Sequence, residues 1–492
     1  MHDSKRILWI PAVLSLATAC ADVPPHGCAN GHQCVLVERK ANTPAAAPMR
    51  EQSGPLVGIA VSGGGSRAAT FAESVLEELA KVDVGPDGTP ASVLEHVQYM
   101  SSVSGGSLAT AYYVLNKPPR DVPMLVRADT LSGDYTDFFQ RYGQQMRANW
   151  EGPLWQPILD DATGRAFDIA NSWDAKLFDG RTFADQGRRE AAGDSPYVIL
   201  NGTSWDNGRR VVFTNLPQSS FSYQFVERTR EYLRQSGLAA GELKLLDARL
   251  QPESDRFRPI TAEEINADFS SLKVSIAVAS SASVPLLIGP VLYSVGEVDC
   301  AKGPCLHIGD GGMFDNQGVE SLAQVLFGQL LPPPGAGATT PPVRKGLMIV
   351  IDGSYPMHDV NFGEAHSVLA YLTRSPSRVS DIMEERALGY QLLLWSILRA
   401  NSAGPHPVIP GPDRMELVYF RHIDAAAAIA AQPDGLCGWN HPLAAVEVET
   451  RLRAIPTRFT IDPKCDAPLL QRAARELVRN QRERIRQIFS TQ

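Results

Sequence analysis

The chain is short of positive charge. It has 46 lysine and arginine residues against 54 aspartate and glutamate residues, and its formal net charge is −8 at pH 7. Because no basic face is evident that could neutralise phosphates, nucleic acid is not expected as a partner. The sequence also contains no internal repeat and no long run of like charges. What remains is an ordinary globular composition, 44% hydrophobic over 492 residues, which is enough for one large core or two.

Long apolar runs are also lacking, and the one at the amino terminus is too short for a membrane span. It covers residues 7–17 and follows a short positive segment with Lys5 and Arg6, an arrangement typical of a secretory signal. The small residues before Cys20 resemble a bacterial lipoprotein signal, although alanine stands where leucine is usual. We expect a signal peptide over 1–19 and a lipid anchor at Cys20. Plain secretory cleavage, leaving a free thiol, is the alternative.

Cysteine is scarce, and its count is informative. The chain has 7 cysteines, and an even number remains once Cys20 is set aside. An even number in an exported chain suggests disulfides, and the simplest pairing joins each cysteine to its nearest neighbour in sequence. The spacings do not resemble a zinc site, and reduced core cysteines are the alternative. The candidates are Cys28, Cys34, Cys300, Cys305, Cys437 and Cys465.

The segment after the signal is rich in proline, alanine and small polar residues. Over residues 20–54 this composition predicts a flexible tether between the anchor and the fold. We expect the tether to hold the protein in the bacterial cell envelope, at the outer membrane facing the periplasm; without lipidation the chain would be secreted. A membrane surface is therefore an expected partner, contacted through the lipid anchor. The sequence does not indicate an oligomeric state.

A glycine-rich loop follows the first predicted strand. Residues 55–62 form a continuous apolar run with β-branched residues, which predicts a buried strand. Gly63-Gly64-Gly65-Ser66-Arg67 comes next, and apolar residues at helical spacing follow it. A loop of this kind presents unpaired backbone N–H groups, backed by a helix amino terminus, to a negative group.

Three interpretations of this loop stay open on the residues alone. The first is an oxyanion hole for acyl transfer. The second is dinucleotide binding, because Gly63, Gly65 and Ala68 fit G-x-G-x-x-A, with Asp83 where a ribose-binding acid would lie. However, residues 81–88 are typical of a loop, and an exported protein has little access to nicotinamide cofactors, so no cofactor is expected. The third interpretation is a structural turn.

A serine stands at the corner after the next predicted strand. Residues 97–103 are typical of a strand, and Ser104 separates them from a predicted helix. Such a corner can be an ordinary tight turn, but it also has the geometry of a nucleophile whose hydroxyl stands clear of the backbone. Gly105 and Gly106 would let the helix approach the strand closely. Strand, helix, strand and corner together predict a parallel α/β start.

A second candidate carboxylate site lies much later in the chain. Asp310 follows a short β-like stretch that includes His307, and two glycines follow it. An Asp-Gly-Gly sequence can be a plain turn, or it can hold a carboxylate at a strand end with room for another side chain to reach it. Asp310 and Asp315 together suggest a metal site, but too few ligands cluster here, and no metal is expected. An Ala/Ser-rich helix that starts at Lys273 and is closed by Pro285 precedes this segment.

The other predicted elements extend the α/β pattern. They are a mostly helical, aromatic region over 118–190, a hairpin over 197–214 with an Asn-Gly turn, a helix over 319–331, a buried strand over 346–352, an amphipathic helix over 376–401, a strand over 415–420 and a charged terminal helix over 468–490.

Taken in order, these motifs resemble the patatin-like phospholipase family, in its bacterial lipoprotein-type form, which shares its catalytic architecture with cytosolic phospholipase A2. Gly63-Gly-Gly-Ser-Arg-Ala68 is similar to the oxyanion motif of the family, and Ser102-Val-Ser-Gly-Gly106 to its G-x-S-x-G. Asp310-Gly-Gly312 is similar to its D-G-[GA], and the Ala279–Pro285 segment to its A-S-x-A-x-P stretch. The joint occurrence is far more specific than any single motif.

The resemblance implies a fold and a chemistry. The fold would be α/β, a three-layer αβα sandwich around a mainly parallel sheet over 55–355, with 356–492 as an α+β extension packed on it. The protein would be a serine lipid acyl hydrolase, a carboxylic ester hydrolase acting mainly on phospholipids. Ser104 would be the nucleophile and Asp310 the general base of a Ser–Asp dyad. Gly63, Gly64 and Gly65 would form the oxyanion hole, with Arg67, Gly105, Gly106, Gly311 and Gly312 in support.

Two departures from the family pattern leave alternatives open. Ser102 replaces the first glycine of the serine motif, and Ala68 replaces the last glycine of the oxyanion motif. Neither change removes a catalytic group, but both would fit a catalytically silent envelope lipoprotein that binds lipid or acts as a scaffold. A Ser–His–Asp esterase with His307 or His366 as the base is a further alternative.

Overall fold

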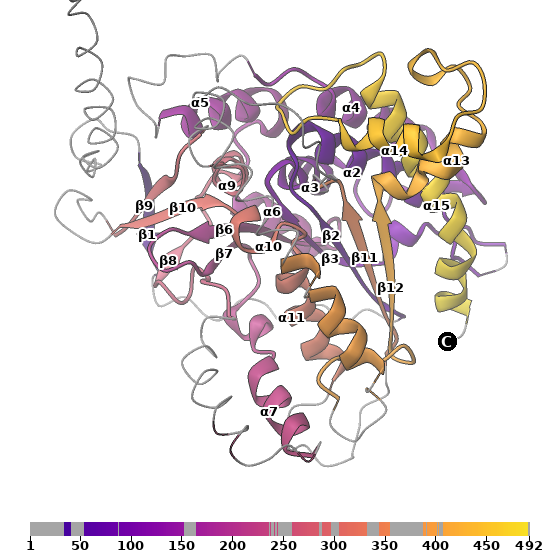
Figure 1. Ribbon diagram of the computed structural model, residues 1–492. Helices are drawn as coiled ribbons and strands as arrows, with labels where there is room; N and C mark the ends of the chain where they lie inside the picture. Colours follow the sequence, from indigo (N-terminus) through magenta and orange to yellow (C-terminus); the bar gives the residue numbers. More distant parts are fainter. Residues whose placement is uncertain are drawn as a thin grey trace, which may run out of the picture.

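The fold is described from a computed structural model in which one large sheet runs through the molecule (Figure 1). The strand order is β12-β11-β2-β3-β6-β10-β9-β1-β8, and β7 pairs with β6 outside this path. The structure describes residues 34–40, 54–86, 88–151, 164–235, 237, 241, 244, 258–284, 288–296, 305–331, 344–354, 387–389, 391–400, 402 and 407–490.

The strands that precede and position the candidate site form the parallel half of the sheet. From β12 to β6 every neighbouring pair is parallel, whereas β10 is antiparallel to both β6 and β9. All residues of β2, β3 and β11 are buried, as expected for parallel strands covered on both faces. These five strands are β2 (Leu56–Val61), β3 (Val97–Val103), β6 (Tyr197–Ser204), β11 (Gly346–Asp352) and β12 (Met415–Arg421).

Alternate residues of each central strand serve two separate cores, so the sheet is the middle of three layers. In β2, Val57, Ile59 and Val61 belong to a core with α2, α3, α4 and α15, whereas Leu56 and Ala60 belong to a core with α11. The mostly parallel, helix-covered α/β sandwich predicted from the sequence is confirmed. These helices are α2 (Gly65–Ala80), α3 (Ser104–Asn116), α4 (Gly133–Met146), α11 (Val319–Leu330) and α15 (Asp466–Ser490).

The smaller elements connect and flank these layers. Apart from β1, which is described below, the other strands are β4 (Leu125–Arg127), β5 (Thr130–Leu131), β7 (Arg210–Phe213), β8 (Ala267–Asp268), β9 (Val291–Val295) and β10 (Leu306–Asp310). Other α-helices are α5 (Gly164–Trp173), α6 (Phe183–Ala192), α7 (Phe225–Gln235), α9 (Val274–Ser281), α10 (Gly312–Asp315), α13 (Ala426–Ala431) and α14 (Ala445–Arg453). Short 3-10 turns cover 93–96, 218–221, 422–425 and 436–438, and a π-helical turn covers 174–178.

The prediction of a flexible tether over 20–54 is wrong for one segment. Val35–Arg39 forms a strand, β1, that pairs with β9 and β8 inside the main sheet. Its residues alternate, since Val35 and Val37 are buried and Leu36 is 60% exposed. Burial of two valines on one face and hydrogen bonds to the neighbouring strands fix this segment in the sheet, although the composition of the flanking sequence is typical of a linker.

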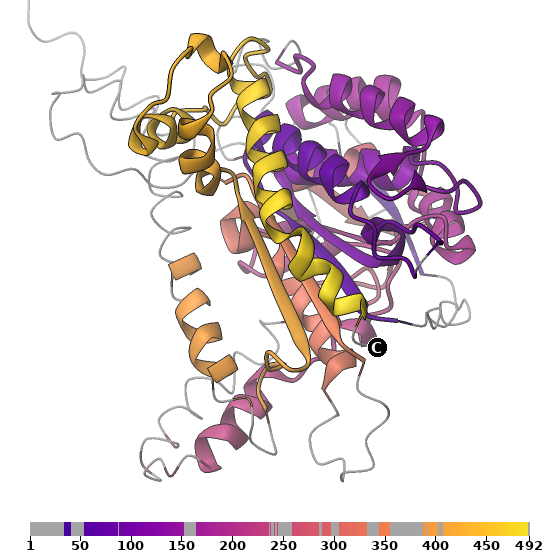
Figure 2. The same ribbon diagram turned by 90° about the vertical axis from the view of Figure 1, so that its right-hand side faces the viewer.

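The carboxy-terminal extension completes the sheet and braces the glycine loop. β12 is the edge strand beside β11, and α15 lies along α2, the helix that the glycine loop begins (Figure 2). A disulfide joins Cys437 to Cys465 in this region. Cys34 and Cys305 are also disulfide-bonded, whereas Cys28 and Cys300 lie outside the described residues. The predicted signal peptide and Cys20 lie outside them too.

A helix with apolar exposed residues lies on the α11 side of the sheet. Residues 391–400 are helical, and Trp395 packs on Phe327 of α11 with ring centroids 5.6 Å apart. The amino-terminal part of the helix predicted over 376–401 lies outside the described residues, apart from 387–389. No helix of the described ranges has the length and hydropathy needed to cross a membrane.

Candidate functional site

Ser104 stands at a strained corner between β3 and α3. Its φ is +52°, in the left-handed region that residues other than glycine rarely adopt. The helix that follows is pressed against the glycine loop: a Cβ on Gly105 would lie 2.1 Å from the Gly65 carbonyl oxygen, and one on Gly106 would lie 2.4 Å from the Ser62 carbonyl oxygen. Only glycines fit there, which explains the small residues after Ser104.

Asp310 lies beside this corner although more than two hundred positions separate the two residues in sequence. β6 lies between β3 and β10, with Asn201 paired to Val103 and Gly202 paired to Asp310. The residues that follow β3 and end β10 therefore flank β6 at the same level. The Ser104 hydroxyl makes a side-chain hydrogen bond to the Asp310 carboxyl group, and both residues are only 6% exposed.

The two glycines after Asp310 have distinct geometric reasons. A Cβ on Gly311 would lie 2.4 Å from the Asn201 carbonyl oxygen, so a side chain would prevent the turn from folding over β6. The Gly312 N–H donates to Asp310 Oδ1 at 2.7 Å. The turn therefore leaves one carboxylate oxygen held by backbone and brings the carboxyl group within reach of Ser104.

Burial dominates the electrostatics of Asp310. It raises the pKa of this carboxyl to about 6, against an ordinary value of 3.8, while the hydrogen bonds from Gly312 and Ser104 act in the opposite direction. Desolvation disfavours the ionised form and the two donors favour it. A carboxylate that is ionised at neutral pH but has a raised pKa is a competent proton acceptor.

The glycine loop contacts the corner and has two N–H groups available. Gly64 and Gly65 have φ values of +134° and +60°, and among the described residues no acceptor bonds their N–H groups. The N–H of Gly63 donates instead to the Asn316 carbonyl at 2.8 Å, so Gly63 does not supply a free donor. It still lies close to the nucleophile, because a Cβ on Gly63 would be 3.2 Å from Ser104 Cβ.

Arg67 fixes the glycine loop to the carboxy-terminal part of the chain. Its Nε donates to the Gly353 carbonyl at 2.7 Å and its Nη1 to the Ile455 carbonyl at 2.6 Å. The side chain is 1% exposed, so these charge-assisted bonds are shielded from water. Ser66 N–H donates to the Arg458 carbonyl at 2.7 Å. The loop is therefore braced from residues 353 and 455–458, outside the motifs read from the sequence.

The departures at Ser102 and Ala68 are accommodated without disturbing the corner. The Ser102 hydroxyl lies 3.3 Å from the Ser107 hydroxyl and hydrogen-bonds to it. Ala68 is buried and packs on Gly353, where a Cβ would come within 2.7 Å of the Ala68 Cα. Neither side chain displaces Ser104 or Asp310.

Other predicted candidates lie apart from this corner. His307 Nδ1 bonds to Asp206 Oδ1 at 2.8 Å near the surface, and His366 lies outside the described residues. Asp315 Oδ2 accepts the Glu320 N–H at 2.7 Å and so caps α11. Within the described part of the chain, no three metal-binding side chains cluster.

Sequence reasoning missed two residues that contact the corner. Ser281, the last residue of α9, accepts the Ser104 N–H through its hydroxyl at 3.0 Å. Asn201 of β6 donates through its side-chain amide to the Ser102 carbonyl at 2.9 Å. Ser281 lies within the Ala/Ser segment noted in the sequence, whereas no local pattern points to Asn201.

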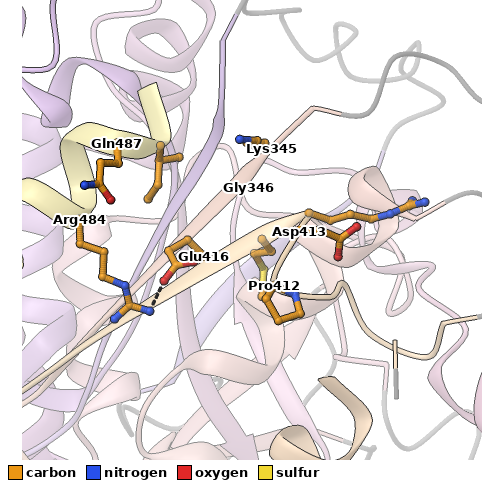
Figure 3. A pocket seen from close by; sticks show the side chains of 10 residues that line it. Lys345, Gly346, Pro412, Asp413, Glu416, Arg484 and Gln487 are labelled. Carbon is orange, nitrogen blue, oxygen red and sulfur yellow. Dashed lines mark ion pairs between the residues drawn. The ribbon is translucent and has the colours of Figure 1, made fainter. Parts of the chain in front are cut away.

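A cavity of about 380 Å³ lies at the amino ends of β11 and β12, whereas the Ser104 corner lies at the carboxyl end of β3 (Figure 3). It opens beside Gly346 and Met415, the first residues of β11 and β12, and Arg484 of α15 pairs with Glu416 at its wall. Ser104 follows the carboxyl end of β3, which is parallel to these strands. This cavity is therefore not part of the candidate site.

Comparisons with solved structures give similarities at low sequence identity. The chain is similar to human GIVD cytosolic phospholipase A2 at 13% identity, with a TM-score of 0.43, over 89% of this chain and 60% of that one. It is also similar to VipD from Legionella pneumophila at 11% identity, with a TM-score of 0.30, over 92% and 71% of the two chains. No curated protein sequence matches the chain.

The family comparison is more specific. The model of the family described as Patatin-like phospholipase matches residues 59–323, which is more than half of the 492 residues. The matched range begins in β2 and includes the glycine loop, the Ser104 corner and the Asp-Gly-Gly turn. The chain belongs to the patatin-like phospholipase family.

Proposed function

We propose that this protein is a serine lipid acyl hydrolase that uses Ser104 and Asp310 as a catalytic dyad. The observation that carries the proposal is the buried hydrogen bond between the Ser104 hydroxyl and the Asp310 carboxyl group. The glycine loop lies against the serine corner, and the N–H groups of its Gly64 and Gly65 have no acceptor among the described residues. A nucleophile, a base and oxyanion donors are the parts that acyl transfer requires.

In the proposed first step, ionised Asp310 takes the hydroxyl proton while Ser104 Oγ attacks the ester carbonyl carbon. The carbonyl π-electron pair moves to oxygen, and the N–H groups of Gly64 and Gly65 stabilise this oxyanion, an effect often worth about 3 kcal/mol. As the tetrahedral intermediate collapses, the C–O bond to the leaving alcohol breaks and protonated Asp310 gives its proton to that alcohol. An acyl ester on Ser104 remains.

In the second step, Asp310 takes a proton from water, and the hydroxide attacks the acyl ester. Collapse of the second tetrahedral intermediate breaks the bond to Ser104 Oγ, which receives the proton from Asp310. The products are the free fatty acid and regenerated enzyme. Neither step needs a histidine. This agrees with the structure, in which His307 hydrogen-bonds to Asp206 and not to Ser104.

Lipid is the substrate class that the family implies, and one surface supports it. In the helix over 391–400, Leu392, Leu393 and Leu394 are 41%, 57% and 44% exposed. This helix packs beside Gln317 and Val319, which follow the Asp310 turn. An exposed apolar surface near the segment that follows the Asp310 turn suits a lipid aggregate better than a soluble ester.

The test is hydrolysis of a fluorogenic long-chain acyl ester, presented in phospholipid vesicles, by the full chain and by Ser104→Ala and Asp310→Asn. We expect both variants to lose at least about a thousandfold in kcat. Full activity in either variant would refute the dyad. His307→Ala and His366→Ala are measured beside them, because loss of activity in one of these would instead support the Ser–His–Asp alternative.

A further inference from the structure

The hydroxyl of Ser281 is the centre of a buried hydrogen-bond network behind the nucleophile corner. It accepts the Ser104 N–H at 3.0 Å, lies 2.9 Å from the Ser107 hydroxyl and donates to the Asn201 carbonyl at 2.5 Å. Ser281 is fully buried. Two of these bonds end on the first turn of α3, at Ser104 and Ser107, and the third ends on β6, at Asn201.

The directions of these bonds follow from counting protons. A serine hydroxyl has one proton to donate, and Ser281 gives its proton to the Asn201 carbonyl, which can only accept. Ser107 must therefore donate to Ser281, and Ser102 must in turn donate to Ser107. The chain of hydroxyls runs in one direction, from Ser102 to Asn201, and Ser281 is the only one of these three serines that bonds to Ser104.

The backbone around Ser281 also holds the Asp310 turn. The Ser281 carbonyl accepts the Gly311 N–H at 3.2 Å, and the Ser283 carbonyl accepts the Asp310 N–H at 3.0 Å. The end of α9 is thus bonded to the nucleophile corner through a side chain and to the base turn through the backbone. One short segment fixes the two turns relative to each other.

We infer that Ser281 is a positioning residue, which holds the strained Ser104 corner in register with the Asp310 turn. This inference rests on the proposed function. The left-handed φ of Ser104 is unfavourable on its own, so it persists only while neighbouring bonds hold it. Removing the Ser281 hydroxyl leaves the buried Ser104 N–H without its acceptor. The corner is then free to relax, which displaces Oγ from the carboxyl group of Asp310.

The experiment compares Ser281→Ala with Ser280→Ala in the full chain. Ser280 is the adjacent residue of α9 and equally buried, but its hydroxyl bonds to Ile276 and Tyr293. Both variants lose one buried hydroxyl, so both should lower the thermal unfolding midpoint. Only Ser281→Ala is expected to lower kcat, by about 10- to 100-fold, with KM within about twofold, because misplacing a reacting group costs about this much.

A second readout separates positioning from general destabilisation. The hydrogen bond from Ser104 lowers the pKa of Asp310, so weakening it should move the acidic limb of the kcat/KM profile to higher pH in Ser281→Ala and not in Ser280→Ala. Equal kcat values and unshifted profiles in the two variants would overturn the inference. If Ser281→Ala does not fold, Ser281→Cys, which keeps a weaker acceptor in a similar volume, is expected to have intermediate kcat; unchanged kcat in this variant would count against the inference.

The same assay distinguishes failure of the inference from failure of the proposed function. Wild type and Ser104→Ala are measured alongside. If their activities do not differ, Ser104 is not the nucleophile and the proposed function fails. If activity depends on Ser104 while Ser281→Ala behaves like Ser280→Ala, only the positioning role is refuted.

Discussion

Replacing Asp310 with asparagine should stabilise the folded protein at neutral pH. Asparagine keeps an oxygen that can accept the Gly312 N–H bond, but it has no charge to desolvate. Burial raises the pKa of Asp310 from 3.8 to about 6, so the folded protein binds this proton more tightly than the unfolded chain does. The contribution of Asp310 to the free energy of unfolding therefore falls as pH rises through about 4 to 6. Above that window the cost of burying the charged carboxylate is present in full.

The size of the effect follows from the same shift. A rise of the Asp310 pKa from 3.8 to about 6 destabilises the folded protein by about 3 kcal/mol at neutral pH, but by less than about 1 kcal/mol at pH 4. For a chain of this length, a change of about 1 kcal/mol in the free energy of unfolding moves the midpoint of thermal unfolding by about 1 °C. The difference in midpoint between Asp310→Asn and wild type should thus grow by about 2–3 °C between pH 4 and pH 8.

The assay is differential scanning calorimetry of the two proteins at both pH values. Asp137→Asn, on the exposed face of α4, removes the same charge without uncovering a buried site and serves as the matched control. A difference between Asp310→Asn and wild type that is the same at both pH values would refute the reasoning, because it would mean that Asp310 ionises equally easily in the folded and unfolded chains.

Three other outcomes are expected. Activity should fall about tenfold per pH unit below about pH 6 as Asp310 becomes protonated, since a general base must be ionised; a kcat/KM profile that stays flat down to pH 4.5 would contradict this. Gly105→Ala should abolish activity and lower the free energy of unfolding by about 1–3 kcal/mol, because the added Cβ would meet the Gly65 backbone. Gly328→Ala in α11 should fold normally, because nothing lies within 4 Å of the added Cβ. Growth of the expressing bacterium with labelled palmitate should label wild type and not Cys20→Ala, and label on both would exclude an anchor at Cys20.

The central strands were predictable because their signal is local. Continuous apolar runs around residues 56–61, 97–103 and 346–352 became buried parallel strands, since a sheet covered on both faces needs no polar alternation. The corner at Ser104 was equally predictable from the sequence, because glycines are needed where the start of α3 approaches the backbone of the glycine loop. The proximity of Asp310 was not local and followed only from the family resemblance.

What could not be predicted depends on contacts between distant segments. β1 has a short alternating pattern in a linker-like composition, and its place in the sheet is set by pairing with β9 and β8. Arg67 is braced by carbonyls from residues 353 and 455, which no spacing rule links to it. Ser281 is one of several serines in an Ala/Ser run, and only the packing of α9 against the corner distinguishes it from Ser280.

Covalent labelling tests the central claim, that Asp310 activates Ser104, most directly. The full chain is incubated with a fluorophosphonate probe, and the labelled peptide is identified by mass spectrometry over a time course. A single adduct on Ser104 is expected, absent in Ser104→Ala and formed at least about a hundredfold more slowly in Asp310→Asn. An adduct on another residue, or labelling of Asp310→Asn at the wild-type rate, would contradict this claim.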